Sequence, residues 1–187
     1  MVLTFSSYKK LQRGETAPSF ILKGIDEKTH KLEELKGKKA TLIIFMCNHC
    51  PYVVPKFQYI NELGKKYAQN GLSIIGINSN DTENYPEDSF EKMKEYAQKY
   101  NFNFTYLIDE TQQIAKEYGA ECTPDPFLFD KDLKLAYHGR FDDAHRDKHE
   151  KGTTAEMEDA IKETLEEKQI SVGSLPSCGC NIKWKKL

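Results

Sequence analysis

The chain lacks the features of a nucleic-acid-binding or membrane-spanning protein. Its 187 residues carry 27 Lys and Arg against 29 Asp and Glu, so there is no excess of positive charge to bind a polyanion. Its longest apolar run is far too short to cross a bilayer. Residues 1–10 lack the charged-then-apolar order of a secretory signal. We therefore expect a soluble, cytoplasmic protein with neither a nucleic-acid nor a membrane partner.

Cysteine is scarce and odd in number, which argues against a framework of structural disulfides. The five cysteines form a C-x-x-C pair (Cys47 and Cys50), a single residue (Cys122) and a C-x-C pair (Cys178 and Cys180). Small secreted scaffolds carry even numbers of cysteines at regular spacings. Redox or metal chemistry in a reducing compartment fits this pattern better, and no cofactor is expected.

Apolar runs alternate with segments of helical period, which predicts an α/β fold. Continuous apolar runs predict buried strands at 39–46, 72–78 and 104–108. Helices are expected from about 50 to 70 with a kink at Pro55, from Pro86 onward, at 111–118 before Gly119, and at 153–168. Residues 127–129 and 133–137 form a predicted hairpin. This order predicts one domain over 1–187, with helices on both faces of a central mixed sheet and a tail at 171–187.

Three motifs carry a resemblance to a known family. The first motif, at residues 14–20, is Gly-Glu-Thr-Ala-Pro-Ser-Phe and precedes the predicted strand at 39–46. The second, at residues 45–53, is Phe-Met-Cys-Asn-His-Cys-Pro-Tyr-Val and begins where that strand ends. The third is Thr123-Pro124, which precedes the predicted hairpin. This pattern resembles the thioredoxin-like superfamily, in its redoxin branch of alkyl-hydroperoxide-reductase and thiol–disulfide oxidoreductase relatives. The second motif is similar to that of a subgroup of thiol–disulfide isomerases. The resemblance implies a three-layer fold with an N-terminal extension and a helix and strand inserted after Ile77.

The two prolines beside the C-x-x-C motif favour different cysteines as the nucleophile. Pro51 favours Cys50, because proline is tolerated best at the first helical position, directly after the cap. Pro55 favours Cys47, because a proline at this distance from the first cysteine is the usual thioredoxin pattern. We prefer Cys50 as the nucleophile with Cys47 as its partner, and both possibilities stay open at this point.

The resemblance also assigns roles to residues outside the motif. Thr123 and Pro124 are expected to form a cis-proline loop that faces the cysteines, with Pro126 as a rival position. Cys122, next to this loop, is either a resolving cysteine or a bystander. His49, as a cation, would stabilise a thiolate, or it is simply an exposed turn residue.

The C-terminal tail allows two interpretations. If it folds back over the active site, Cys178 or Cys180 could resolve a disulfide. If it only packs on the surface, Ile182 and Trp184 anchor it, and this second interpretation is preferred. The two cysteines of the tail are too close in sequence to pair with each other without strain.

The leading functional hypothesis is a thiol–disulfide oxidoreductase acting on a disulfide-bearing protein or a small thiol substrate, with an unidentified reductant. An atypical thiol peroxidase is the alternative. Peroxiredoxins have the pattern P-x-x-x-T-x-x-C before the reactive cysteine, and counting back from Cys50, Ile43 and Cys47 stand in place of the proline and threonine, which weakens this hypothesis. Arg140 could still supply a cation near the thiolate. Ile44 also replaces the buried carboxylate of thioredoxin. A third possibility is a metal-binding module built from Cys47, His49 and Cys50 with Cys122 or the tail pair.

Overall fold

A computed structural model describes residues 2–186 and contains two β-sheets. The larger sheet has seven strands in the order β3-β2-β6-β5-β4-β8-β9, and the smaller has three in the order β1-β10-β7. The strands are β1 (Leu3–Phe5), β2 (Ile21–Gly24), β3 (Thr29–Lys31), β4 (Ala40–Phe45), β5 (Leu72–Asn78), β6 (Thr105–Ile108), β7 (Cys122–Thr123), β8 (Asp125–Asp130), β9 (Leu135–His138) and β10 (Cys178–Asn181). The α-helices are α1 (Leu32–Leu35), α2 (Phe57–Tyr67), α3 (Phe90–Lys99), α4 (Gln113–Tyr118) and α5 (Glu156–Leu165).

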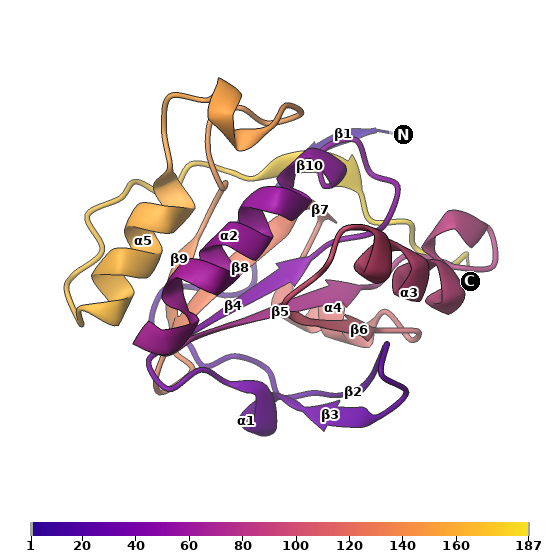
Figure 1. The fold of residues 1–187 in the computed structure, drawn as a ribbon, viewed down its shortest axis with the longest axis horizontal. Coiled ribbons are helices and arrows are strands. Elements are labelled where there is room, and N and C mark those ends of the chain that lie inside the picture. The colour runs from indigo at the N-terminus through magenta and orange to yellow at the C-terminus, as the bar shows by residue number, and fades with distance from the viewer. Residues whose placement is uncertain (1, 187) are drawn as a thin grey trace.

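The larger sheet is mixed and is covered on both faces, as the sequence predicts. β5 is its middle strand and is parallel to both β6 and β4, whereas β4 is antiparallel to β8 on its other side. Helices α2 and α5 lie in front of this sheet and α4 lies behind it (Figure 1). The result is a layer of helices on each side of one sheet. Among residues 2–186, no helix has the length and apolar character needed to cross a membrane.

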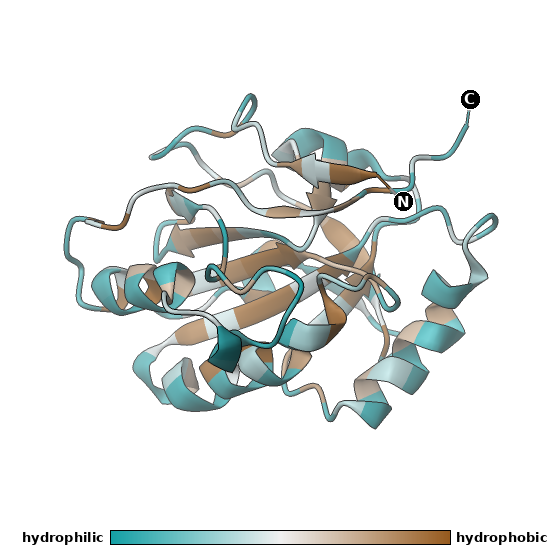
Figure 2. Cartoon of the chain, turned by 90° about the horizontal axis from the view of Figure 1, so that it is seen from above, coloured by the Kyte–Doolittle hydropathy of each residue, from teal (hydrophilic) through white to brown (hydrophobic). Residues whose placement is uncertain are grey.

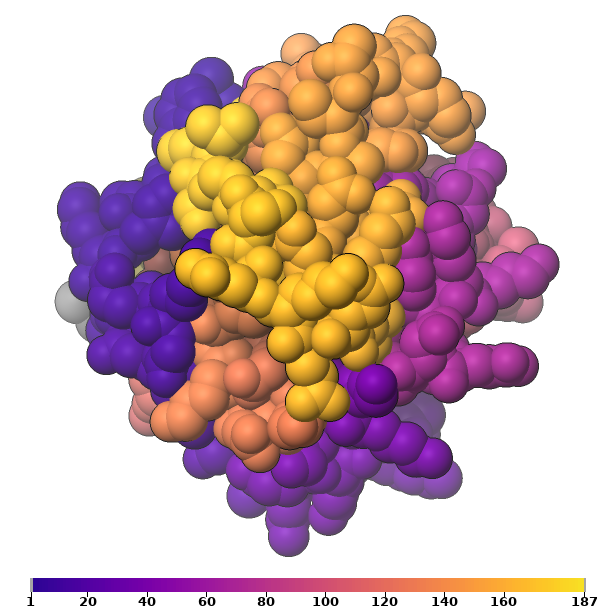
Figure 3. Space-filling view, turned by 90° about the vertical axis from the view of Figure 1, so that its left-hand side faces the viewer, coloured from indigo at the N-terminus to yellow at the C-terminus, as the bar shows by residue number. Residues whose placement is uncertain are grey.

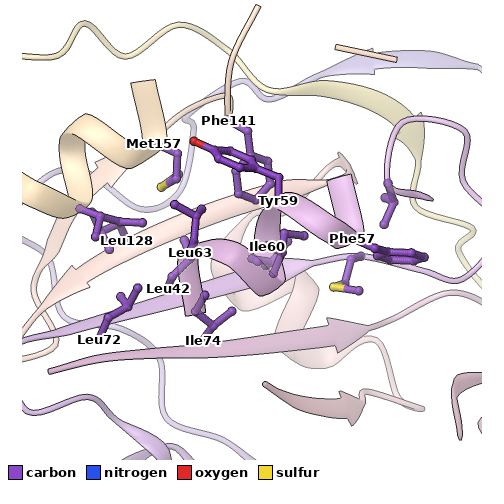
Figure 4. Close-up of a cluster of buried hydrophobic side chains, with 14 of the residues drawn as sticks. Leu42, Phe57, Tyr59, Ile60, Leu63, Leu72, Ile74, Leu128, Phe141 and Met157 are labelled. Carbon is purple, nitrogen blue, oxygen red and sulfur yellow. The ribbon is translucent and has the colours of Figure 1, made fainter. Parts of the chain in front are cut away.

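Alternate residues of β4 point into two different cores, because successive side chains of a strand face opposite sides. Leu42 and Ile44 pack with α2 and α5, whereas Ile43 and Phe45 pack with α4. All four are at most 1% exposed, and burying each such side chain contributes about 1.5–3 kcal/mol. Figure 4 shows the first core between α2, α5 and the sheet, and Figure 2 shows apolar strands inside a more hydrophilic outer layer.

The predicted elements are present, with boundaries that differ at the helix starts. The expected kink at Pro55 is a 3-10 helix (Val54–Lys56) that precedes α2. Gly119 ends α4 with a φ of 72°, in the left-handed region that glycine favours. The helix expected from Pro86 begins later, at Phe90 with Ser89 as its cap, because Pro86–Asp88 forms a separate 3-10 turn. That turn points Asp88 into the protein, where it is fully buried.

The smaller sheet was not predicted, and it joins both ends of the chain to the centre. The tail strand β10 pairs antiparallel with β1 on one side and with β7 on the other. Figure 3 shows the C-terminal segment at the surface, beside the N-terminal residues. The preferred interpretation of the tail is right for Ile182, which is 1% exposed, but wrong for Trp184, which is 39% exposed. The tail also lies close to the C-x-x-C motif, as the other interpretation proposed, because β10 pairs with β7, whose Thr123 contacts both sulfurs.

Candidate active site

The C-x-x-C motif lies where β4 ends, and a helical turn begins at its second cysteine. The carbonyl of Cys50 accepts hydrogen bonds from the amides of Val53 (2.9 Å) and Val54 (3.0 Å). Pro51 follows directly, at a position where its missing N–H leaves no bond unmade. A turn thus begins at Cys50, but the 3-10 helix starts only at Val54 and α2 only at Phe57, so Cys50 is not the cap of either helix. Which sulfur attacks the substrate stays a prediction.

The predicted proline loop faces both sulfurs. The Thr123–Pro124 peptide bond is cis, whereas Pro126 lies inside β8 opposite Ile44. The Cys50 Sγ is 3.2 Å from the Thr123 carbonyl oxygen, and the Cys47 Sγ is 3.7 Å from the Thr123 hydroxyl. One residue of the loop thus contacts the two cysteines through different atoms. The rival position for the loop, Pro126, is wrong.

The two cysteines differ in acidity, although both are buried. The pKa of Cys50 is far below that of an ordinary thiol, first because the Cys180 side chain hydrogen-bonds to its sulfur and second because Cys47 does the same. The pKa of Cys47 is raised, because its thiol donates to Cys50, because it is buried, and because the carboxylate of Asp88 is near. These shifts favour the thiolate at Cys50 over the thiolate at Cys47, and the thiolate is the nucleophilic form.

Asp88 is the site residue that sequence reasoning missed. Its Oδ1 accepts a hydrogen bond from the Asn48 amide (2.9 Å) and its Oδ2 accepts one from the Asn80 side chain (2.7 Å). Donor atoms of Cys47, His49 and Asp88 all lie within 4.8 Å of one another. In the sequence, Asp88 was visible only as an acidic residue in an expected first helical turn. Ile44 occupies the position where thioredoxin has a buried carboxylate. In this protein Asp88, from a different element, brings a buried carboxylate to the dithiol instead.

His49 is partly exposed and lies against this carboxylate. Its Nδ1 is 3.0 Å from the Asp88 Oδ1, close enough for an ion pair, although the angle is not that of a hydrogen bond. Asp88 is the main cause of a raised pKa at His49, and the charge of Cys50 raises this pKa further. An imidazolium here and a thiolate at Cys50 stabilise each other. This favours the role of a cation over that of a mere turn residue.

Cys122 is held as a thiol beside the loop. Its Sγ lies 3.7 Å from the Ser6 hydroxyl and donates to the Pro124 carbonyl oxygen at 3.5 Å. Burial, and next the charge of Asp125, raises its pKa. Asp125 is itself fully buried and binds Ser6 (2.6 Å) and His138 (2.7 Å). The catalytic role of Cys122 stays a prediction, and its surroundings suit a structural thiol.

Two other expectations about charged and metal-binding groups can be compared with the structure. Arg140 donates a hydrogen bond from its Nε to Glu156 at 2.9 Å. Burial raises the pKa of Cys178, and the nearby charge of Arg140 partly offsets this rise. Arg140 is thus committed to a carboxylate rather than to the thiolate of Cys50. The metal-binding hypothesis expected Cys47, His49 and further cysteines to lie together. Among the described residues, Cys47 and His49 do lie together, but the third potential metal ligand beside them is Asp88 rather than a cysteine.

A buried dithiol at the end of a central strand, facing a cis-proline loop, defines a protein of the thioredoxin-like class. The profile of the Redoxin family matches residues 12–160, and the chain belongs to that family. The thioredoxin domain of a thiol-disulfide oxidoreductase from Bacteroides vulgatus has the same fold, with a TM-score of 0.60 at 17% identity over 69% of this chain and 89% of that one. The predicted thioredoxin-like fold is therefore confirmed.

Relatives with higher identity indicate the kind of activity. The chain is 32% identical over 133 residues to the thiol-disulfide oxidoreductase ResA of Bacillus thuringiensis, a match that covers 70% of this chain and 71% of ResA. A weaker match, 30% over 112 residues, is to a chloroplastic peroxiredoxin Q of Populus jackii and covers 49% of it. A crystal structure of an uncharacterized conserved protein from Geobacillus kaustophilus is 40% identical, with a TM-score of 0.91 over 100% of this chain and 98% of that one. The protein is a thiol–disulfide oxidoreductase.

Proposed function

We propose that this oxidoreductase attacks its substrate with Cys50 and releases it with Cys47. The observation that carries the proposal is the asymmetry of the pair: hydrogen bonds from Cys180 and Cys47 lower the pKa of Cys50, whereas donation to Cys50 and burial raise the pKa of Cys47. An attacking sulfur must be a thiolate, and a resolving sulfur is needed only after the mixed disulfide has formed. The preference for Cys50 thus rests on electrostatics as well as on Pro51.

The reaction then proceeds in two exchanges. The Cys50 thiolate attacks one sulfur of a substrate disulfide, forming a Cys50–substrate bond and releasing the other substrate sulfur as a thiolate. Cys47 next loses its proton and attacks the Cys50 sulfur, so that a Cys47–Cys50 disulfide forms and the substrate leaves as a thiol. The Asp88 carboxylate is placed beside Cys47 to take its proton. An external dithiol reductant returns the enzyme to its reduced form.

The proposal includes a disulfide-bearing protein or small thiol as substrate and a cytoplasmic location. The odd number of cysteines supports a reducing compartment. Peroxide reduction, and with it an antioxidant role, is the second candidate, and the match to peroxiredoxin Q favours it. Against it, Cys47 occupies the position of the peroxiredoxin threonine. Peroxide consumption with a recycling thiol, together with trapping of a sulfenic acid at Cys50, distinguishes the two activities.

The test is dithiothreitol-dependent reduction of insulin by the full chain. Cys50→Ser should abolish the activity and Cys47→Ser should lower it strongly, whereas Cys178→Ser, a control at a sulfur outside the pair, should resemble the wild type. If Cys50→Ser retains activity and Cys47→Ser does not, the nucleophile is Cys47. If both variants reduce insulin at the wild-type rate, the proposed function is wrong.

A further inference from the structure

The tail strand β10 is held in place by hydrogen bonds on both sides of its C-x-C motif. Before the strand, the Ser177 hydroxyl donates to the Pro124 carbonyl oxygen at 2.6 Å. After it, the Ile182 amide donates to the Glu121 carbonyl oxygen at 3.1 Å, and the Lys183 amide donates to the Asn80 side chain at 2.9 Å. Bonds on both sides of the C-x-C motif hold its cysteines in one place over the dithiol.

Gly179 allows the tail to approach the loop more closely than any other residue would. A Cβ atom at this position would lie 1.9 Å from the Thr123 carbonyl oxygen and 2.6 Å from its carbonyl carbon. Contacts under 3.0 Å essentially never occur for real Cβ atoms, and the obstacle is backbone. The residue between the two tail cysteines must therefore be glycine for β10 to lie where it does.

This approach brings Cys180 to the reactive sulfur. Cys180 is opposite Thr123 in the β10–β7 pairing, and the carbonyl of the same Thr123 contacts the Cys50 Sγ. Cys180 and Cys50 also belong to one buried cluster, with exposures of 5% and 0%. The Cys180 thiol donates to the Cys50 sulfur, which lowers the pKa of Cys50 and raises that of Cys180. A thiol that donates to a thiolate is placed to exchange disulfides with it.

We propose that Cys180 is a third redox-active cysteine that forms a disulfide with Cys50, so that the tail competes with Cys47 for the nucleophile. The step rests on the proposed function, which supplies the Cys47–Cys50 disulfide. Cys180, having lost its proton, attacks the Cys50 sulfur. The Cys50–Cys180 bond forms, the Cys47–Cys50 bond breaks, and Cys47 leaves as a thiolate and takes up the proton. Cys180 can attack a Cys50–substrate disulfide in the same way, releasing the substrate thiol.

The other two cysteines are engaged elsewhere. The Cys178 Sγ lies 3.0 Å from the His145 Nδ1, and Cys122 contacts Ser6 and the Pro124 carbonyl. Among these three sulfurs, Cys180 is the one that packs in the same buried cluster as Cys47 and Cys50, and it lies opposite Thr123 in the β10–β7 pairing. The geometry therefore points to Cys180 rather than to Cys122 as the cysteine that competes with Cys47.

The first test maps disulfides after oxidation of the reduced full chain with one equivalent of diamide, blocking with N-ethylmaleimide and proteolysis. Cys47→Ser should yield a peptide pair linked through Cys50 and Cys180, and the wild type should contain this pair besides the Cys47–Cys50 peptide. Cys178→Ser is the matched control and should give the wild-type pattern. A Cys47→Ser protein without the Cys50–Cys180 pair overturns the inference.

The second test separates this inference from the proposed function. Insulin is added to Cys47→Ser and to the Cys47→Ser, Cys180→Ser double variant, and the mixed disulfide on Cys50 is measured by mass. It should accumulate in the double variant and be resolved in the single variant. Equal accumulation in both refutes the role of Cys180 alone, whereas no adduct on Cys50 in either refutes the proposed function.

Discussion

Replacing Gly179 by alanine should detach the tail from the active site. The added Cβ would lie 1.9 Å from the Thr123 carbonyl oxygen, so β10 must retreat by about 1.5 Å to reach ordinary contact. Such a shift breaks the pairing of β10 with β7, which consists of two residue pairs. The loss of about two backbone hydrogen bonds costs about 2–3 kcal/mol. At 1.4 kcal/mol for each factor of ten, the undocked population rises about 30- to 150-fold.

The rate of alkylation of Cys50 by iodoacetamide measures this population, because Cys50 is fully buried while the tail is docked. The measurement uses a Cys47→Ser background, so that one sulfur of the motif is labelled. It is made at about pH 9.5, above the ordinary thiol pKa, so that Cys50 is a thiolate with or without its contact to Cys180. The expected result for Gly179→Ala is an increase of about 30- to 150-fold in rate.

Gly173 provides the matched control within the same tail. A Cβ atom there meets nothing within 4 Å, so Gly173→Ala should alkylate at the parent rate. If Gly179→Ala labels Cys50 no faster than Gly173→Ala does, then β10 does not cover the nucleophile in solution. The close approach of the tail to the proline loop would then be the wrong explanation for the glycine.

Three further predictions concern charge. In Cys180→Ser, alkylation of Cys50 should rise with pH up to the ordinary thiol range, whereas in the wild type it should be flat from about pH 5 to 8, because the lowered pKa leaves the thiolate formed throughout. Protonated His49 stabilises the fold through Asp88, which raises its pKa, so this contribution is complete below about pH 6.5 and is lost as pH rises through the folded-state pKa. In urea unfolding at several pH values, His49→Gln should therefore lose most stability relative to the wild type at low pH. Lys56→Met should cost about 1.5–3 kcal/mol in urea unfolding, because it removes a buried ammonium 2.6 Å from the Asp142 carboxylate and leaves His149 as the remaining ion-pair partner of that carboxylate. Lys151→Met, in an exposed pair, should change stability by less than about 0.5 kcal/mol, and equal effects of the two variants would contradict the burial argument.

Local sequence patterns determined most of the larger sheet and half of the active site. Apolar runs predicted β4, β5 and β6, because strands covered on both faces need such runs. The C-x-x-C motif located the dithiol, and Pro51 located the start of the helical turn at Cys50, because proline restricts its own neighbours. Thr123–Pro124 could be recognised in the same way.

The tertiary structure decided what surrounds the dithiol. Asp88 reaches it from a turn 38 residues beyond Cys50 in the chain, and nothing in its local sequence distinguishes an inward carboxylate from a helix-capping one. The tail strand is only four residues long, contains a glycine and shows no clear apolar alternation, so periodicity could not predict it. Its place depends on backbone pairing with residues more than 50 positions away and on the missing Cβ of Gly179. The lowered pKa of Cys50 follows first from that contact, because a hydrogen bond donated to a thiolate stabilises its charged form.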